Sequence, residues 1–415
     1  MSGFYRKMIE TTLTAILDRF EADPDYGFID TKLDLITGEN FDDCSDPALA
    51  FRRKKYIYSW IQGRGLEAMA RHLEFLPGFA PRLIPLLTKV AASMERLRAR
   101  TGRIWFVTDT DGNPLKVEGF SRLCPLEKIP EPANYSELFY YKGLFAAGRT
   151  LNRAELCKIA VTGFKKVLDD IEAERFQTDQ QAFDPHNPVT YIPGRSLQGP
   201  KMIALGGLAL LMNAGETTYN WPDYAARFIA NVFDRHLYRP GFGFMEAVTS
   251  AGQPYEISGR VLGDPGHAGE FVGLAGKCLR NRAFAADYPE LAKRAAELLP
   301  QILDFNFKLG FSPSAGGIVK SIDLKTGRVF NSDMPWWNLP ETMRAACFMN
   351  RPDIFEKCSD CFRRCYVNPQ VHMMAYQTRN LTGEVVRVVP ATPDADPGYH
   401  TNLSMIDVLE CNMTE

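Results

Sequence analysis

Two of the six histidines stand where an imidazole could do acid–base chemistry. His267 follows the Gly/Pro loop Gly263-Asp-Pro-Gly, and Glu270 comes three residues later, so the two side chains occupy neighbouring positions on a helix surface. His400 lies in a loop just ahead of the last helical segment. An imidazole at a loop end can face a cavity and transfer a proton near neutral pH. The alternative for His267 is a histidine that only caps its helix.

A pair of adjacent tryptophans, Trp336 and Trp337, precedes a helical segment that carries Pro340 and Glu341 in its first turn. Proline and an acid are typical of a helix start, and the carboxylate would lie near the positive end of the helix dipole. An indole presents an apolar face to the C–H face of a pyranose, while a carboxylate binds its hydroxyls. Two interpretations stay open: a sugar platform with an acid beside it, or a packed Trp pair with a capping glutamate.

Arg64 interrupts an apolar helical segment in Trp60-Ile-Gln-Gly-Arg. An arginine on a buried helix needs an anionic or polar partner, because the burial of an unpaired charge is costly. The segment therefore predicts a polar partner or ligand for this guanidinium.

The elements that must position these residues include five short segments with one common pattern. In each, a polar turn with a glycine separates alternating stretches, which indicates a β-hairpin because glycine supplies the positive φ of a tight reversal. The turn glycines are Gly38, Gly112, Gly252, Gly327 and Gly383. Most intervals between them are about 75 residues or roughly twice that, so one supersecondary unit is expected to recur along the chain.

The segments between the hairpins are helical in character. Residues 138–147, 202–212, 271–279 and 291–299 are rich in Ala, Leu and Met and too long for buried strands. Several of them are apolar or small almost all round, whereas residues 154–168 have one polar and one apolar face. Alternating buried and half-exposed helices predict two concentric rings. We therefore expect a mainly α fold, an (α/α)6 barrel (toroid) with short β-hairpins between helices.

Composition fits a single domain over residues 1–415, because no Ser/Gly tract, charge block or low-complexity run indicates a linker. With 48 basic and 50 acidic residues the net charge is −2, which gives no electrostatic basis for binding nucleic acid or an anionic membrane. No apolar run reaches the length of a membrane span, and the N-terminus lacks the apolar core of a signal peptide. A cytoplasmic protein is expected, and nine cysteines without disulfide-framework spacing fit reduced thiols.

Three cysteines, Cys358, Cys361 and Cys365, raise the question of a metal site, with His372 further along. Spacings of three and seven residues place all three thiols on one face of a helix, among aromatic residues. The second pair of a zinc knuckle is missing. We expect core packing, in which free cysteines behave as small hydrophobes, and no metal.

In this order and spacing the motifs resemble those of the N-acylglucosamine 2-epimerase superfamily, over nearly the whole chain. The resemblance implies an (α/α)6 barrel whose central funnel binds an aldose or amino sugar. Members include N-acylglucosamine 2-epimerases, cellobiose 2-epimerases and aldose–ketose isomerases. It rests on Gln62-Gly-Arg64, Trp105-Phe106 with Asp109-Thr-Asp-Gly112, Pro265-Gly-His267-x-x-Glu270, Gly316-Gly-Ile318, Trp336-Trp337-x-x-x-Glu341 and Tyr399-His400.

The resemblance implies roles for five residues: His267 and His400 as an acid/base pair, Arg64 as the group that holds the sugar oxygen, and Glu270 and Glu341 as polar support. One base would remove the C2 proton and an acid on the opposite face would return it, through a cis-enediolate. An isomerase needs only one histidine, which delivers the C2 proton to C1. Neither route requires a metal or cofactor. The expected partner is a small sugar, with a homodimer as one alternative for the assembly.

The chain departs from the family pattern at three points. The usual His-x-Pro-Arg reads His-Thr-Asn-Leu from His400, which removes an arginine expected near the sugar. The usual Trp-Trp-Pro-Gln reads Trp-Trp-Asn-Leu, which makes Asn338 the polar group beside the tryptophans. Lys201 is foreign to the family pattern. It could bind a carboxylate, sulfonate or phosphate of the substrate, or it could point away or pair with an acid of the protein.

Two alternatives from other classes remain. An inverting glycoside hydrolase would use paired carboxylates about 6.5–9.5 Å apart, for which Glu270 with Glu341 or Asp264 are candidates. A catalytically silent sugar-binding homologue is suggested by the missing C-terminal arginine. The epimerase or isomerase interpretation predicts that the two histidines, the two glutamates and the arginine converge on one funnel.

Overall fold

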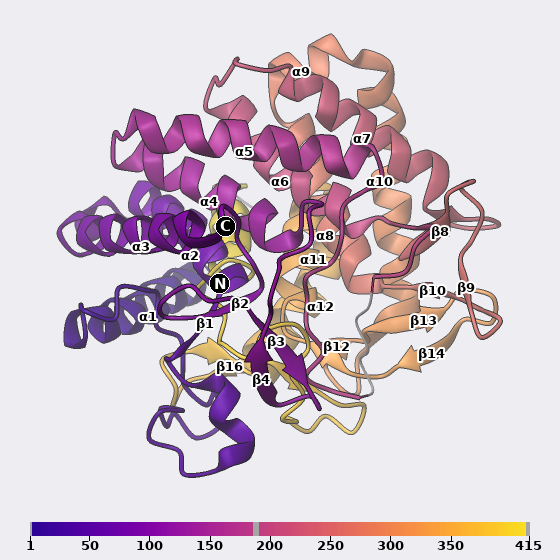
Figure 1. The fold of residues 1–415 in the computed structure, drawn as a ribbon. Helices are drawn as coiled ribbons and strands as arrows, with labels where there is room; N and C mark the ends of the chain where they lie inside the picture. The colour runs from indigo at the N-terminus through magenta and orange to yellow at the C-terminus, as the bar shows by residue number, and fades with distance from the viewer. Residues whose placement is uncertain (1, 186–190, 412–415) are drawn as a thin grey trace. The chain divides into compact units, whose positions relative to one another are not determined.

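Most of the regular structure is helical in the computed structural model, which describes residues 2–185 and 191–411 (Figure 1). The chain divides into two compact units, and each is assembled from separate stretches of sequence. The first unit comprises residues 1–191, 367–377 and 387–406. The second comprises residues 192–366, 378–386 and 407–415.

In the first unit, α2 packs against both α3 and α4, and α4 packs against α5. Gly63 on α2 and Gly143 on α4 let the two backbones touch, since a Cβ on Gly143 would lie 2.1 Å from the carbonyl oxygen of Gly63. The helices are α1 (Ser2–Ala22), α2 (Ser59–Phe75), α3 (Ala80–Thr101), α4 (Tyr135–Thr150) and α5 (Ala154–Glu172), with 3₁₀ turns at Pro47–Arg52 and Pro77–Phe79.

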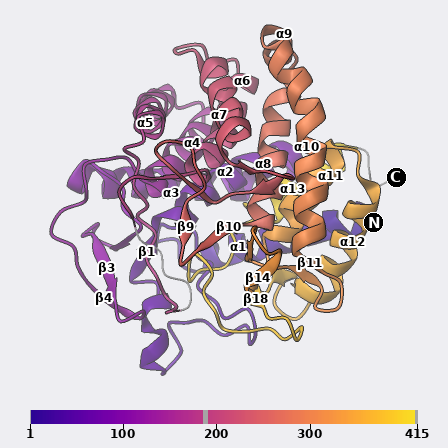
Figure 2. The same ribbon diagram turned by 90° about the vertical axis from the view of Figure 1, so that its right-hand side faces the viewer.

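The second unit is built around α8, which packs against α6, α10 and α11. Figure 2 shows α9 at one end of the long α10. The helices are α6 (Gly199–Asn213), α7 (Trp221–Arg235), α8 (Pro265–Leu279), α9 (Arg282–Asp287), α10 (Pro289–Gly310), α11 (Asn338–Phe348) and α12 (Pro352–Cys361), which continues into the π-helical turn Phe362–Tyr366. The last helix, α13 (Asn402–Glu410), begins in the first unit and ends in the second.

The strands are short and antiparallel. In the second unit β14, β13, β10 and β9 form a four-stranded sheet in that order, and four further pairs are two-stranded: β5–β8, β6–β7, β11–β12 and β15–β18. Their bounds are β5 (Arg195–Leu197), β6 (Leu237–Tyr238), β7 (Gly243–Phe244), β8 (Ala247–Thr249), β9 (Glu256–Ile257), β10 (Arg260–Gly263), β11 (Phe311–Ser312), β12 (Gly317–Ile318), β13 (Ser321–Asp323), β14 (Arg328–Asn331), β15 (Met334–Pro335) and β18 (Thr378–Arg379). The first unit holds β1 (Tyr56–Tyr58) paired with β2 (Val107–Asp109), β3 (Leu115–Glu118) with β4 (Arg122–Pro125), and β16 (Val367–Asn368) with β17 (Met374–Ala375).

All five turn glycines adopt the positive φ that the sequence predicts, between 71° and 87°. At each of them the backbone N–H donates to a carbonyl three or four residues earlier, as from Gly327 to Asp323 at 2.8 Å in the turn between β13 and β14. An alanine there would have to adopt a left-handed conformation that L-residues disfavour. The predicted hairpin turns are confirmed.

The predicted difference between helices is also confirmed. α4, α6 and α8 are buried on nearly every face, whereas α5 buries one face and exposes the other. A helix buried all round presents mostly small or apolar residues, and these three do so with Ala, Gly, Leu and Phe beside a few buried charged side chains.

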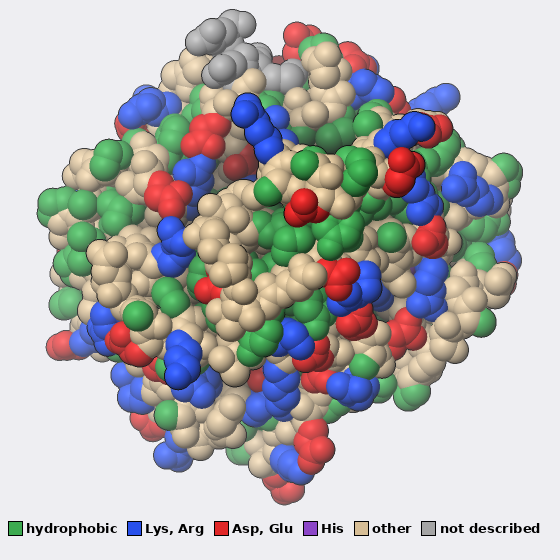
Figure 3. All heavy atoms as spheres, turned by 90° about the horizontal axis from the view of Figure 1, so that it is seen from above, with side chains coloured by type: hydrophobic (Ala, Val, Ile, Leu, Met, Phe, Trp, Pro, Cys, Tyr) green, Lys and Arg blue, Asp and Glu red, His purple; other side chains and the backbone are tan. Residues whose placement is uncertain are grey.

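The surface carries both signs of charge. Figure 3 shows basic and acidic side chains interspersed on one face, in keeping with the nearly balanced composition. Within the described residues, none of the helices is both long enough and apolar enough to cross a membrane.

The three neighbouring cysteines lie where α12 passes into its π-helical turn. Cys358 and Cys361 are buried, as core packing predicts, and Cys365 is partly exposed. A Cβ on Gly316 would lie 2.7 Å from the sulfur of Cys365, so this loop packs closely against the thiols. In the described part of the chain, the clusters whose ligand atoms are close enough to share a metal ion do not include these cysteines.

Candidate active site

His267 lies in the first turn of α8, a helix that starts where its sequence predicts. Asp264 is the N-cap: its Oδ1 accepts hydrogen bonds from the backbone N–H groups of Gly266 at 2.9 Å and His267 at 3.0 Å. Pro265 occupies the first helical position, where its missing N–H is no loss. The cap is therefore Asp264, and the imidazole of His267 is free for another role. About a fifth of its side chain is exposed.

A second residue, Glu246, orients that imidazole. Its Oε1 lies 2.8 Å from Nδ1 of His267 and also accepts a hydrogen bond from Nε2 of Gln198 at 2.9 Å. A carboxylate can only accept, so the proton of the neutral imidazole is placed on Nδ1. Nε2 is then the basic nitrogen and is available for proton transfer.

Asp264 also contacts a lysine. Its Oδ2 lies 2.5 Å from Nζ of Lys320 and 3.3 Å from Nδ1 of His267. The same ammonium lies 5.5 Å from the ring centroid of Trp337. Asp264 thus joins the start of α8 to the loop after β12, which carries Lys320.

The charges of this cluster set its proton affinities. Burial alone would lower the pKa of His267, but the carboxylates of Asp264 and Glu246 outweigh burial and raise it above its usual value. Burial alone would raise the pKa of Glu246, yet the neighbouring His267 and Lys320 bring it down to about 2. The pKa of Lys320 is raised by Asp264 and Glu246 against the effect of burial. With His267 protonated, the cluster holds two positive and two negative charges.

The ligand atoms of Glu246, Asp264 and His267 lie within 4.8 Å of one another, close enough to share a metal ion. However, Asp264 uses one oxygen on the helix N-terminus and the other on Lys320. A metal cation would have to displace the ammonium of Lys320, which already supplies the positive charge beside Asp264.

Glu270 and Glu341 lie next to each other in the second unit. Both side chains are buried, and their carboxylate oxygens come within 4.8 Å. Glu341 pairs with Arg344 one turn further along α11, and Arg344 lies 3.7 Å from Asp407. Repulsion between two close carboxylates is thus reduced by a buried guanidinium.

A stripe of glycines on α8 brings these two glutamates together. A Cβ on Gly266 would lie 2.0 Å from Oδ1 of Asn338, and one on Gly269 would lie 2.6 Å from Oγ1 of Thr342. Helices approach this closely only where one of them lacks side chains. The stripe faces α11 and consists of Gly266, Gly269, Gly273 and Gly276.

The predicted platform residues are mostly buried. Trp336 and Trp337 pack edge to face with centroids 4.8 Å apart and keep 2% and 5% of their surface exposed. Asn338 is fully buried, and its Nδ2 donates to the carbonyl of Ile318 at 3.0 Å. This geometry matches the packed-pair interpretation of the sequence, and a role in binding sugar stays a prediction for all three.

Lys201 lies in the first turn of α6 and is buried. After burial itself, the charge of Lys201 is the largest cause that lowers the pKa of His236, to about 3. Lys201 therefore acts on a histidine of its own unit. Its contact with a substrate anion stays a prediction.

The other two predicted residues belong to the first unit. The guanidinium of Arg64 lies over the rings of Phe139 at 4.2 Å, Trp60 at 5.2 Å and Tyr399 at 5.4 Å. His400 is buried in the turn before α13, edge to face with Tyr399. The convergence of Arg64 and His400 with the residues of the second unit stays a prediction.

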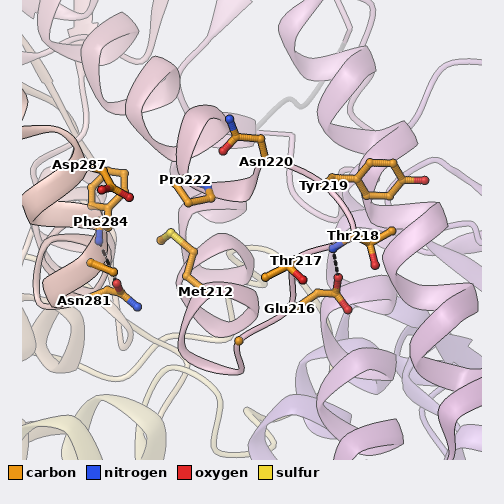
Figure 4. Close-up of a pocket in the computed structure, with 12 residues that line it drawn as sticks. Met212, Glu216, Thr217, Thr218, Tyr219, Asn220, Pro222, Asn281, Phe284 and Asp287 are labelled. Atoms are coloured by element: carbon orange, nitrogen blue, oxygen red, sulfur yellow. Dashed lines mark hydrogen bonds between the residues drawn. The ribbon is translucent and has the colours of Figure 1, made fainter.

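The pocket drawn in Figure 4 is separate from this cluster. It has a volume of about 480 Å³ and lies around the loop between α6 and α7, beyond the C-terminal end of α8, whereas His267 is at the N-terminal end. A helix of 15 residues separates the two by roughly 20 Å. Two amides that line the pocket, Asn220 and Asn281, cap the helices that follow them. The pocket is lined by Met212, Gly215, Glu216, Thr217, Thr218, Tyr219, Asn220, Pro222, Asn281, Ala283, Phe284 and Asp287.

Comparison of the whole chain with solved structures identifies its fold. No protein-family model and no curated protein sequence matches the chain. Among solved structures, D-mannose isomerase aligns with a TM-score of 0.67 at 14% identity, over 99% of this chain and 98% of that one. Cellobiose 2-epimerase from Bacillus thermoamylovorans aligns with a TM-score of 0.67 at 13% identity, over 99% and 100%. The chain has the fold of these sugar-converting enzymes.

This fold confirms the predicted class, a mainly α chain of the (α/α)6-barrel type with short hairpins between helices. The fold agrees with the resemblance to the N-acylglucosamine 2-epimerase superfamily, and at 12–14% identity the likeness to these structures is one of fold alone. A glycosidase in complex with glucose aligns as well, with a TM-score of 0.53 at 11% identity, over 99% of both chains. The reaction must therefore be argued from the site.

Sequence reasoning missed Glu246 and Lys320, although a signal was present. Each lies two residues beyond the second strand of a short hairpin, β7 or β12, in the runs Gly-Phe-Met-Glu and Gly-Ile-Val-Lys. The hairpins β6–β7 and β11–β12 pair in the same register, so these positions are equivalent in the repeat. Alignment of the repeats with one another would have placed both charged side chains at one structural position.

Proposed function

We propose that the chain is a sugar 2-epimerase or aldose–ketose isomerase that acts on a free monosaccharide or N-acylamino sugar through a cis-enediolate. The observation that carries this proposal is the imidazole of His267, which is one-fifth exposed and which Glu246 holds through Nδ1, so that Nε2 is left for proton transfer. The fold shared with a mannose isomerase and a cellobiose 2-epimerase supports the reaction class.

In this proposal the neutral His267 removes the proton from C2 of the open-chain sugar. The imidazolium that forms is stabilised by Glu246, whose carboxylate accepts the hydrogen bond from Nδ1. Isomerisation follows if the same nitrogen returns the proton to C1. Epimerisation follows if a second base, His400, returns it to C2 from the opposite face of the enediolate.

The roles of the remaining predicted site residues are assigned from their charge and polarity. Arg64, whose guanidinium lies over three aromatic rings, is assigned to the developing negative charge on the enediolate oxygen. Glu270 and Glu341 are assigned to polar support of the proton transfer. Substrate contacts are assigned to four residues at helix starts: Lys201, Trp336, Trp337 and Asn338.

A glycoside hydrolase is the second candidate, because a glycosidase shares the fold. Glu341, one of its two candidate carboxylates, is buried and pairs with the guanidinium of Arg344. Asp264 is engaged by the helix N-terminus and Lys320. These contacts favour proton transfer by His267 over hydrolysis by paired carboxylates.

The test is incubation of the full chain with a panel of free aldoses and N-acylamino sugars in D2O, with deuterium entry at C1 and C2 followed by NMR. We expect exchange at C2 for at least one sugar, and its loss in His267→Asn. The matched control is His372→Asn, an exposed histidine at φ 52°, a conformation that asparagine tolerates. Exchange that survives His267→Asn would refute the proposal, and hydrolysis of a disaccharide without exchange would favour the glycosidase.

A further inference from the structure

Lys320 is fixed beside the histidine of the candidate site through its backbone and its side chain. Its backbone N–H donates to the carbonyl of Asp333 at 2.7 Å, which holds the loop after β12 against the residues between β14 and β15. Its ammonium donates to Oδ2 of Asp264 at 2.5 Å and lies 5.5 Å from the ring centroid of Trp337. About a fifth of its side chain is exposed, nearly the same share as for His267.

Two carboxylate oxygens lie near Nδ1 of His267. Oε1 of Glu246 accepts its hydrogen bond at 2.8 Å, and Oδ2 of Asp264 lies 3.3 Å away. An N–H has one proton to donate, so the two oxygens compete for it, and the outcome sets the direction of the ring. The ammonium of Lys320 occupies the competing oxygen of Asp264. The lysine therefore leaves Glu246 as the acceptor.

We propose that Lys320 is a positioning residue for the proposed base: by binding Oδ2 of Asp264 it leaves Glu246 as the acceptor for Nδ1 and thereby fixes the direction of Nε2. This inference rests on the proposed role of His267 in the sugar epimerase or isomerase reaction. Lys320 acts through Asp264 and neither gives nor takes the transferred proton.

The charge of Lys320 has a second effect on the imidazole. The distances through Asp264 place its Nζ within about 6 Å of Nδ1 of His267, a range in which a like charge disfavours protonation. Burial and this charge lower the pKa of His267, while the carboxylates of Asp264 and Glu246 raise it by more. Without the ammonium the carboxylates would raise the pKa further, and the base would become neutral only at higher pH.

Other charged groups near the imidazole belong to α8 and the helices packed against it. Glu270 lies one turn along α8. Lys201 is buried in α6, and Glu341 is buried in α11, where it pairs with Arg344. The buried positions of α10 carry uncharged side chains. Lys320 differs from these groups in its direct contact with a carboxylate beside Nδ1.

The first test measures the pKa of His267 by NMR in the full chain with isotope-labelled histidine and without substrate; His267→Asn assigns its signal. We expect Lys320→Met to raise this pKa by about one pH unit and Lys320→Arg to restore it. The matched control is Lys325→Met, which removes the lysine that pairs with Glu256 from the turn between β13 and β14 and should leave the pKa unchanged. An unchanged pKa in Lys320→Met would overturn the inference.

Exchange kinetics in D2O separate positioning from charge. Above the acid limb, where His267 is neutral in every variant, Lys320→Met should reduce kcat for C2 exchange about tenfold and change KM by less than about twofold, because a misdirected base weakens the transition state alone. In the Asp264→Asn background the competing carboxylate is gone, so the same change should reduce kcat by less than about threefold. An equal loss in both backgrounds would overturn the inference.

A second variant covers the case in which Lys320→Met does not fold. Lys320→Gln can still donate to Oδ2 of Asp264 without a charge, so it should raise the pKa of His267 but keep more of kcat than Lys320→Met. Failure of the proposed function has a different signature. If no sugar exchanges at C2, the role of the base is refuted, while the NMR titration still shows whether Lys320 acts on His267.

Discussion

At His267 the two ring nitrogens have different tasks. Nδ1 is bonded to Glu246, and Nε2 is left for the proposed proton transfer. Because the two nearby carboxylates raise the pKa of this imidazole, it stays protonated to a higher pH than a free histidine. A base must be neutral to act, so the charges of Asp264 and Glu246 together set the pH at which the base becomes available.

We therefore predict that kcat/KM for C2 exchange rises with pH along an acid limb whose midpoint lies above 6.5, the usual pKa of histidine. Glu246→Gln keeps an oxygen to accept from Nδ1 but removes the charge. It should move that midpoint to lower pH and reduce kcat about tenfold, because the imidazolium loses its counter-charge. Glu256→Gln, on exposed β9, is the control and should change neither. An unmoved acid limb in Glu246→Gln would contradict the assignment.

Asp264 has two separable effects on stability. Asp264→Asn keeps an oxygen for the cap of α8 but leaves Lys320 without its carboxylate, whereas Asp264→Ala removes both interactions. We predict that both variants unfold at lower urea concentration than wild type, with Asp264→Ala about 1 kcal/mol less stable than Asp264→Asn. Equal stability of the two variants would mean that the cap contributes nothing.

A third residue-scale prediction concerns Asp179 in the first unit. It is almost fully buried, its Oδ1 accepts from Nε1 of Trp60 at 3.3 Å, and Oδ2 accepts from Ser136. Burial raises its pKa to about 7, so the folded state binds this proton more tightly than the unfolded state. Its contribution to stability is complete below its unfolded pKa, near 4, and is lost as the pH rises to 7.

Asp179→Asn removes that titration. We predict that the free energy of unfolding of the variant, relative to wild type, grows by about 1.4 kcal/mol per pH unit between pH 4 and 7. Urea titrations at four pH values measure this difference. A difference between the two proteins that does not change with pH would show that Asp179 is already ionised in the fold. Asp111→Asn, an exposed position, is the control.

The residues of the site were only partly predictable. The spacing of His267 and Glu270 in a Gly/Pro loop and helix start can be recognised along the sequence, because the chemistry is local. The partners of His267 cannot be recognised in this way: Glu246 is 21 residues away, and Lys320 reaches Asp264 over 56 residues. Such contacts depend on how separate hairpins fold back beside α8.

At the scale of elements, the glycine stripe of α8 decides how close α11 comes. We predict that Gly266→Ala destabilises the chain by about 1–3 kcal/mol, because the new methyl overlaps the side chain of Asn338. Gly3→Ala is the matched control, since a Cβ there meets nothing within 4 Å. Thermal unfolding measures the change in stability of each variant relative to wild type.

A double-mutant cycle tests the cause. Asn338→Ala removes the side-chain atoms that the methyl would meet, so Gly266→Ala should cost less in that background than in wild type. Additive costs would place the strain elsewhere, for example in the approach of Gly266 to other parts of α11.

Helix positions were predictable, and helix ends less so. Patterns of Ala, Leu and Met locate α4, α6 and α8, whose composition reflects burial on every face. Pro340 and Glu341 lie in the first turn of α11 as expected, but its first residue, Asn338, could not be located, since Trp337 already has helical backbone angles without a capping side chain. A helix that starts without a cap leaves no local signal in its sequence.

At the scale of the whole molecule, the C-terminal stretch runs from unit to unit. Residues 367–377 belong to the first unit, 378–386 to the second, 387–406 to the first and the rest to the second. Neither unit is a continuous piece of chain, so neither is complete without the end of the sequence. The buried ion pair of Lys32 with Asp394, 362 residues apart, is one contact that no local pattern predicts.

We predict that the chain unfolds in a single cooperative transition, as the single-domain interpretation of the sequence requires. Calorimetric and van't Hoff enthalpies should agree, and far-UV and near-UV circular dichroism should give one midpoint. Two separated transitions would mean that the units are independent domains. The cytoplasmic location and the homodimer stay predictions.

The equivalent positions that follow the short hairpins have an evolutionary consequence. Two residues past the second strand the chain carries Glu246, Lys320 and, after β17, Gln377. Glu246 and Lys320 differ in charge after hairpins of the same register, whereas the turn between β16 and β17 is one residue longer. The two positions therefore carry an acidic or a basic side chain on one backbone geometry, so a single substitution can change the charge there while the hairpin stays unchanged. New substrate preferences would then arise without a new fold.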